Sequence, residues 1–322
     1  MRNPSELPAE LYGRVFTRAR ARSLGVQDSR LRARDVVRVG HGTYQHHPLG
    51  QPAPTVRGPD RPGPDAWELL RALTMRTPNL WVSHVTAAQA YGLSLPRRVV
   101  QDPGIHLTAV NHCIDAEADP RVVLHRVREL PRAFHHRRGI RLSPPGRVFV
   151  ELSRYLSPVE QVCLGDQMVR TPRREWEGSG DPLITLPDLQ KAVEIQRRRP
   201  GIVQARGAVE MVRVGADSVP ETRLRLALLS GGLPEPELQI RLNPNDPDSP
   251  VGDQGYRKQR IVLQYDGEHH FTPEQQQRDQ WRNAQFESAG WTVVIVNRVD
   301  LRRSFRGVVV RVRNLLEHAS QG

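Results

Sequence analysis

The chain has 322 residues, of which 38% are hydrophobic, and its 47 Lys and Arg outnumber its 35 Asp and Glu to give a formal charge of +12. This length suits two or three domains rather than one. The sequence has no apolar run long enough to span a membrane, and residues 1–6 lack the apolar stretch of a signal peptide, so we expect a cytoplasmic protein without membrane contact.

The positive charge is concentrated in two segments. Residues 1–50 hold nine Arg against four acids, net +5, and residues 121–154 hold nine Arg against two acids, net +7. A local basic patch favours contact with a polyanion, although an arginine-rich helix face can also be merely solvated.

Residues 1–47 have the pattern of a small winged helix-turn-helix module. Thr17 can cap a helix over 18–24 that Gly25 ends, and Asp28 can cap a second helix through residue 34. Residues 36–44 then have the composition of a β-wing. In this geometry the second helix would enter the major groove of DNA and present Gln27, Ser29, Arg30, Arg32 and Arg34. A short helical hairpin with protein contacts only is the alternative.

A proline-rich linker at 48–64 separates this module from a middle region at 65–196. His135 and His136 lie in the middle region, but adjacent residues of a strand point to opposite faces, so a shared metal ion is not expected there.

The segments FTRARARSLGV, RLRARD and VGHGTYQ resemble the N-terminal winged-helix domain of AbiEi-type antitoxins from abortive-infection systems. The likeness continues through SHVTAAQAYGLSLP, RVVLHRVREL and GIRLSPPGRVFVELSRYL. It implies binding to double-stranded DNA, control of transcription at an operator and a toxin partner, and it requires no catalysis.

The region 200–322 predicts helices and strands that alternate, and therefore an α/β fold with a mixed sheet. Ser218 can cap a helix with Glu221 at its third position, and 261–266 is a run of strand-forming residues in which Gln264 and Asp266 share one face. A helix from about Thr272 to 289, a strand over 291–296 and a last helix over 305–318 follow.

Two acidic residues suggest a metal site in this region. Asp253 lies about a dozen residues before Asp266, which closes the strand, so both carboxylates can gather at one edge of the sheet. Carboxylate oxygens bind hard divalent cations such as Mg²⁺, which assist hydrolysis of phosphodiesters.

The segments VLQYDGEHH and QQRDQWRNAQFESAGWTVVIVNRVDL resemble a bacterial domain related to very-short-patch-repair endonucleases, within the PD-(D/E)XK restriction-endonuclease-like superfamily. The resemblance makes Asp253 and Asp266 ligands of Mg²⁺ and Glu221 the carboxylate of the helix. It makes His269 or His270 a proton-transfer group and Arg278 and Asp279 supporting residues. The plainer interpretations are a capping box for Glu221, a turn for Asp266, and a solvated pair for Arg278 and Asp279.

The chain departs from the family at two positions. Gln264 stands where Glu is usual, and Gln254-Gly255 follows Asp253 where apolar residues alternate. No lysine stands at the strand position where the superfamily motif has one. The nearest lysine, Lys258, falls in the hairpin before that strand. Three hypotheses follow: a Mg²⁺-dependent DNA endonuclease, a non-catalytic antitoxin-like repressor with a degenerate nuclease domain, and an interaction scaffold without nucleic-acid contact.

Overall fold

The protein folds as two compact units of mixed helix and sheet. A computed structural model describes residues 4–40, 42–47, 64–74, 79–101, 104–110, 122–131, 133–172, 180–267 and 273–319. The first unit spans 1–156 with 195–202, and the second spans 157–194 with 203–322. The division therefore falls inside the segment predicted as one middle region, and residues 48–63 of the proline-rich linker lie outside the described residues. No helix within the described ranges is long and apolar enough to cross a membrane.

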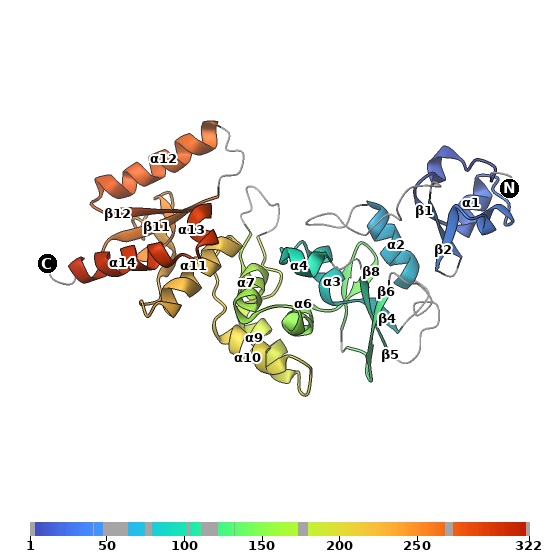
Figure 1. The fold of residues 1–322 in the computed structure, drawn as a ribbon, viewed down its shortest axis with the longest axis horizontal. Helices are drawn as coiled ribbons and strands as arrows, with labels where there is room; N and C mark the ends of the chain where they lie inside the picture. Colours follow the sequence, from blue (N-terminus) through green and yellow to red (C-terminus); the bar gives the residue numbers. More distant parts are fainter. Residues whose placement is uncertain are drawn as a thin grey trace. The chain divides into compact units, whose positions relative to one another are not determined.

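The N-terminal part of the first unit is a three-stranded antiparallel sheet with short helices (Figure 1). Its elements are η1 (Ala9–Leu11), β1 (Val15–Thr17), α1 (Arg18–Ser23), η2 (Arg30–Arg32), β2 (Val36–Gly40) and β3 (Thr43–His46). The Thr17 hydroxyl accepts the Arg20 amide, and Gly25 has φ +78°, so the predicted start and end of α1 are confirmed. The hairpin of β2 and β3 occupies the predicted wing.

The predicted second helix over 28–34 was wrong, because only the 3-10 turn η2 forms. Asp28 does not cap a helix, since its carboxylate pairs with both Arg18 and Arg22 of α1. Arg30 turns inward, and its guanidinium lies 2.6 Å from the buried Asp35 carboxylate. The side chains of this segment thus bind neighbouring elements rather than support a helix of their own.

The rest of the first unit is a five-stranded mixed sheet in the order β6-β5-β4-β8-β7. Its strands are β4 (Leu80–Val82), β5 (Ile105–Val110), β6 (Val122–Val127), β7 (His135–Arg137) and β8 (Ile140–Leu142). The helices α2 (Pro64–Thr74), α3 (His84–Tyr91), α4 (Arg97–Val100) and α6 (Pro145–Glu151), with η3 (Leu152–Arg154), complete it. His135 contacts Tyr91 edge to face while His136 is exposed, so the two rings do not face a common point.

The second unit begins with helices, and a sheet with further helices follows. The helices α7 (Pro158–Val169), α9 (Leu186–Ile195) and α10 (Ile202–Glu210) precede α11 (Val219–Ser230). The strands β9 (Glu237–Arg241), β10 (Val251–Tyr256), β11 (Ile261–Asp266) and β12 (Thr292–Asn297) follow, with α12 (Pro273–Ser288) between the last two. Two helices, α13 (Arg298–Arg302) and α14 (Arg306–Ala319), close the chain. The predicted strands and helices of this region are present, whereas β9 and α13 were not predicted.

The four-stranded sheet, ordered β12-β11-β10-β9, is covered on both faces (Figure 1). Leu263 of β11 packs with Leu228 of α11 and Val312 of α14. On the other face Val262 packs with Phe286 of α12. Alternate residues of β11 thus enter opposite cores. Strands β11 and β12 are parallel, and α12 supplies the crossover connection that parallel neighbours need.

A buried ion pair fixes α11 against α7. The Arg225 guanidinium lies 2.9 Å from the Asp166 carboxylate, and the two side chains are 0% and 1% exposed. Asp166 also accepts the Thr222 hydroxyl and the Arg213 amide, so its oxygens are well supplied with donors. Because α11 carries Glu221 one turn before Arg225, this pair also positions Glu221.

Arg225→Met is expected to destabilise the protein by about 3–5 kcal/mol, because it leaves the buried Asp166 carboxylate without its cation. Urea unfolding followed by circular dichroism measures the change. The control is Arg223→Met, two residues away on the exposed face of the same helix, which should change stability by less than about 0.5 kcal/mol. Equal effects of the two substitutions would contradict the structural role of the ion pair.

Candidate functional site

A cavity of about 870 Å³ opens beside the carboxyl end of β11. It brings together four of the residues selected from the sequence, namely Glu221, Asp253, Gln264 and Asp266, and also the predicted supporting residue Asp279. The remaining walls come from α12, β12 and α13 and consist of Gln280, Arg282, Asn283, Ile295, Arg298 and Leu301, with Ser218, Pro220, Tyr265 and Gly267 beside the acids.

The cavity exists because β10 and β11 separate at Asp253. Their antiparallel ladder pairs 254–256 with 261–263 and stops there. Beyond this point the Asp253 carboxylate accepts the Tyr265 amide at 2.6 Å, in place of a backbone carbonyl. This bond fixes the orientation of the carboxylate at the edge of the opening.

The glycine at position 255 is required by the packing of β10 against β11. A Cβ at this position would lie 2.3 Å from the Ile261 carbonyl oxygen, which no side chain can accommodate. The close approach of β10 to β11 therefore requires glycine just before the two strands diverge. The neighbouring Gln254 is fully buried, and its amide donates to the Glu221 carbonyl at 3.3 Å, which ties β10 to α11.

Glu221 is a buried carboxylate with hydrogen bonds but no cation. It is 7% exposed, and its oxygens accept the Asp217 amide at 2.9 Å and the Ser218 hydroxyl at 2.7 Å. Ser218 caps α11 as predicted. Among the residues that the structure describes, no Arg or Lys pairs with Glu221, unlike Arg225 with Asp166 one turn later.

Burial, and after it the negative charge of Asp253, raises the pKa of Glu221 to about 8. The hydrogen bonds from Ser218 and Asp217 act in the opposite direction but do not compensate. A buried carboxylate beside a second negative charge is disfavoured in its ionised form unless a counter-charge is present. A divalent cation is one such counter-charge.

Gln264 is buried on the cavity wall, and its side-chain amide contacts the neighbouring strand. Its carbonyl oxygen lies 3.4 Å from the Asp253 amide nitrogen and accepts that hydrogen. This oxygen is therefore engaged by the backbone of β10. Its amide nitrogen is buried and finds no hydrogen-bond partner within the described part of the chain.

The part of the cavity wall that α12 forms carries both an acidic and a basic side chain. Asp279 lies 3.1 Å from Arg282, and the Arg282 Nε and the Asn283 carbonyl oxygen are buried with no hydrogen-bond partner among the described residues. The predicted Arg278 is exposed and does not line the cavity. His269 and His270 lie outside the described residues.

The sequence analysis did not select three polar residues of the cavity lining that can contact a ligand, namely Arg282, Asn283 and Arg298. Helical spacing could have found the first two, because they follow Asp279 by three and four residues and share its face. Arg298 begins α13, an element that the sequence did not indicate.

The charged groups of the cavity lining are mainly acidic. The lining holds four carboxylates and two guanidiniums, a balance of −2 if all are ionised. Carboxylate oxygens are the ligands that Mg²⁺ prefers, Asp253 and Asp266 are the expected ligands, and the burial of Glu221 without a paired cation favours a counter-ion. Among the described residues, however, no three of these carboxylates bring their oxygens within 4.8 Å of one another, so the lining offers ligands of the right kind but not a closed set.

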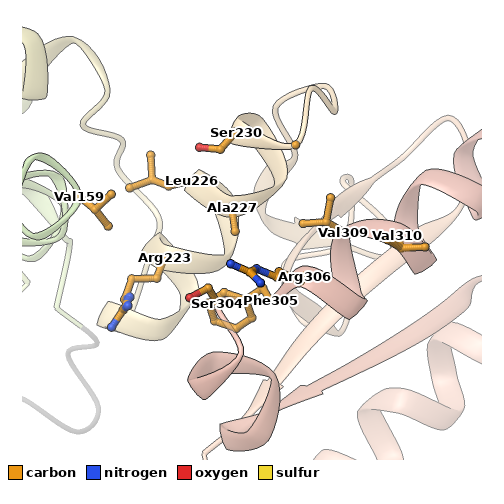
Figure 2. A pocket seen from close by; sticks show the side chains of 11 residues that line it. Val159, Arg223, Leu226, Ala227, Ser230, Ser304, Phe305, Arg306, Val309 and Val310 are labelled. Atoms are coloured by element: carbon orange, nitrogen blue, oxygen red, sulfur yellow. The ribbon is translucent and has the colours of Figure 1, made fainter.

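A second hollow in the same unit has a different character. It measures about 540 Å³ and lies between α11 and the segment around the start of α14, with Val159 of α7 at its margin (Figure 2). Figure 2 shows Phe305 beneath Ala227 and Val309 on the neighbouring wall. Its lining contains no carboxylate, histidine or cysteine, so it offers packing surface rather than acid–base or metal chemistry.

Without divalent cations, Glu221→Gln is expected to raise the melting temperature above that of the wild type at about pH 8, and to leave it nearly unchanged at about pH 5. The unfolded group titrates near 4.5 and the folded one near 8, so the folded state holds the extra proton and stability falls as pH rises through this window. Glutamine keeps a hydrogen-bond acceptor without the charge.

Differential scanning calorimetry in the presence of a chelator measures this effect, with the exposed Glu317→Gln as the control. Mg²⁺ should raise the melting temperature of the wild type more at the higher pH, where the carboxylate is free of its proton. A wild type and a Glu221→Gln variant with parallel pH profiles would contradict the buried charge.

Comparison with known proteins finds relatives without an assigned role. The uncharacterized proteins MT2308 and Rv2248 of two strains of Mycobacterium tuberculosis are each 27% identical over 246 residues. The alignments cover 73% of this chain and 80% of either relative. No protein-family model matches the chain. No solved structure matches it significantly.

Proposed function

We propose that the second unit is a restriction-endonuclease-like domain that hydrolyses DNA phosphodiesters with Mg²⁺, and that the N-terminal winged-helix-like module binds double-stranded DNA. The observation that carries this proposal is the cavity that Glu221, Asp253 and Asp266 line together, from one helix and two diverging strands. A cavity lined by carboxylates from these elements agrees with the resemblance of the sequence to very-short-patch-repair endonucleases.

The acidic residues of the cavity have distinct roles in this proposal. Asp253 and Asp266 hold the ion, and the bond from the Tyr265 amide keeps the Asp253 carboxylate oriented. A bound Mg²⁺ neutralises charge on a scissile phosphate and lowers the pKa of a coordinated water. Glu221 lies beside these ligands, and a cation bound there would favour its ionised form, in which it can accept a proton.

The basic groups of the cavity suit the phosphate. Arg282 and Arg298 line the same wall, and a guanidinium presents several donors to phosphate oxygens. We retain His269 or His270 as a proton-transfer group on the strength of the resemblance. Because the cavity lining contains no lysine, Glu221 or one of these histidines takes the part that a motif lysine would play.

A non-catalytic repressor is the second candidate, and two observations favour it. The Gln264 carbonyl is engaged by the Asp253 amide rather than free for a cation, and lysine is missing from the lining. In this case the cavity would be the remnant of a nuclease site, while DNA binding by the first unit would remain the working activity.

Asp253→Ala is expected to abolish Mg²⁺-dependent nicking of supercoiled plasmid, with DNA affinity in a gel-shift assay unchanged. The loss follows from removal of an expected metal ligand, whereas the sequence of the module proposed to bind DNA is unchanged. Asp188→Ala, an acid on α9 that does not line the cavity, is the matched control and should cleave as the wild type does.

Wild-type protein that binds DNA but cleaves none with Mg²⁺ or Mn²⁺ would overturn the nuclease proposal and leave the repressor. Cleavage that persists in Asp253→Ala would place the activity elsewhere or in a contaminant.

Arg32→Ala is expected to weaken DNA binding and to reduce the slope of log affinity against log salt by about 0.9, the value for one lost phosphate contact. Arg32 is exposed, whereas Arg30 is a poor probe because its removal would strand the buried Asp35. The control is Arg206→Ala, an exposed arginine of α10. Identical salt slopes for wild type and Arg32→Ala would remove Arg32 from the interface.

A further inference from the structure

Three histidines that lie far apart in the sequence meet in the first unit. His84 is the first residue of α3, His106 lies on β5 and His125 lies on the neighbouring β6. One ring nitrogen of each lies within 4.8 Å of the corresponding nitrogens of the other two. This His triad is separate from the carboxylate cavity, which belongs to the second unit.

The pleat of the sheet brings two of the rings together. In the parallel ladder Thr108 lies opposite His125, and His106 is two residues before Thr108, so both histidines project from one face. His106 Nδ1 and His125 Nε2 are 3.0 Å apart. Between uncharged rings one of these nitrogens must carry the proton and the other accept it. A metal ion that takes the place of the proton would bind both.

Hydrogen bonds from surrounding residues fix the His84 ring. Its Nδ1 lies 2.9 Å from the Ser83 hydroxyl, which in turn accepts the Thr108 hydroxyl at 2.7 Å. The Glu151 carboxylate accepts the His84 amide at 3.0 Å and lies 3.8 Å from Nδ1. With Nδ1 engaged in this way, Nε2 is the ligand atom that His84 offers, as in metal sites where a carboxylate or hydroxyl orients the imidazole.

The backbone of His84 is strained. Its φ of +49° lies in the left-handed region, which is unfavourable for a residue with a side chain. Such strain persists only where surrounding contacts enforce it, and it is concentrated at functional sites. Here the bond from the His84 amide to Glu151 and the packing of the ring enforce it.

We propose that His84, His106 and His125 bind a divalent first-row transition ion, Zn²⁺ in the first place. Imidazole nitrogens favour Zn²⁺ over Mg²⁺, which prefers oxygen, so this ion differs from the one proposed for the second unit. Three histidines with a fourth position for water are a known ligand set for zinc. The side chain of His84 is 14% exposed, which gives the ion a route from solvent.

Binding requires a local rearrangement. The rings of His84 and His125 stack with their centroids 3.5 Å apart and their planes 16° apart. Two imidazoles on a tetrahedral ion approach it from directions about 109° apart, so this stack must open when the ion enters. The nearby Arg147 and Arg199 oppose a cation, while Glu151 offsets them in part, so we expect micromolar rather than tighter affinity.

The test is a titration of the full-length protein, stripped of metal and kept in excess Mg²⁺ so that the carboxylate cavity does not compete. Zn²⁺ is added against a chromophoric chelator, and Co²⁺ is added in parallel because its visible absorption reports coordination by histidine nitrogens. We expect one saturable site in the wild type and a rise in melting temperature on addition of Zn²⁺.

His125→Gln should weaken this site by at least about tenfold, remove the Co²⁺ absorption and cancel the thermal shift. His136→Gln, an exposed histidine of the same sheet, is the matched control and should behave as the wild type. If His125→Gln fails to fold without metal, His84→Gln serves in its place.

Absence of a saturable Zn²⁺ site in the wild type would overturn the proposal, as would undiminished Zn²⁺ affinity in a folded His125→Gln or His84→Gln variant. Because neither the metal titration nor the thermal shift measures cleavage, failure of the nuclease proposal leaves this test intact.

Discussion

Burial of ionisable groups is the constraint on which both units depend, because a charge removed from water must be neutralised, paired or bound to a counter-ion. The helix α11 shows two of these outcomes one turn apart. Arg225 is paired with Asp166 inside the protein, and the pair anchors the helix against α7. Glu221 is equally buried but has no cation among the described residues, and its pKa is raised to about 8. The paired site holds the fold together, whereas the uncompensated one is suited to bind a cation.

The same constraint governs the first unit. The small N-terminal module contains a buried polar group made of Arg30, Asp35 and His46. Arg30, which the sequence placed at the DNA surface, is therefore used for internal packing. The His triad meets the constraint in another way, because burial lowers the pKa of His84 and of His125 and so favours their uncharged rings. The rings of His106 and His125 also contact each other, with two nitrogens 3.0 Å apart. The two proposed metal sites thus differ in donor chemistry, oxygen in one and nitrogen in the other.

Strand geometry decides where the carboxylates can act. Gly255 permits β10 and β11 to lie close together, and immediately beyond it the ladder ends and the Asp253 side chain replaces a backbone acceptor for Tyr265. The divergence of the strands leaves room for a cavity that a continuous sheet would fill. Helix α12 forms another wall with Arg282 and Asn283, and the buried Nε of Arg282 and the carbonyl oxygen of Asn283 have no hydrogen-bond partner among the described residues. A polar ligand would satisfy these atoms as well as Glu221.

Local chemistry in the sequence determined the elements with strong signals of their own. These include α1 with its Thr17 cap and terminal Gly25, α11 with its Ser218 cap, and β11 with Gln264 and Asp266 on one face. Such signals act between neighbouring residues and need no tertiary contact.

Only the tertiary structure decided features that depend on partners distant in the chain. The predicted helix over 28–34 does not form, since the side chains of this segment pair with other residues. Asp28 binds Arg18 and Arg22 of α1, and Arg30 binds the buried Asp35. Arg298 reached the cavity through an unpredicted helix, and His84, His106 and His125 have no common spacing that a sequence pattern could show. Burial, which sets the charge state of Glu221 and of the His triad, is a property of the packed chain, so no reading of neighbouring residues could supply it.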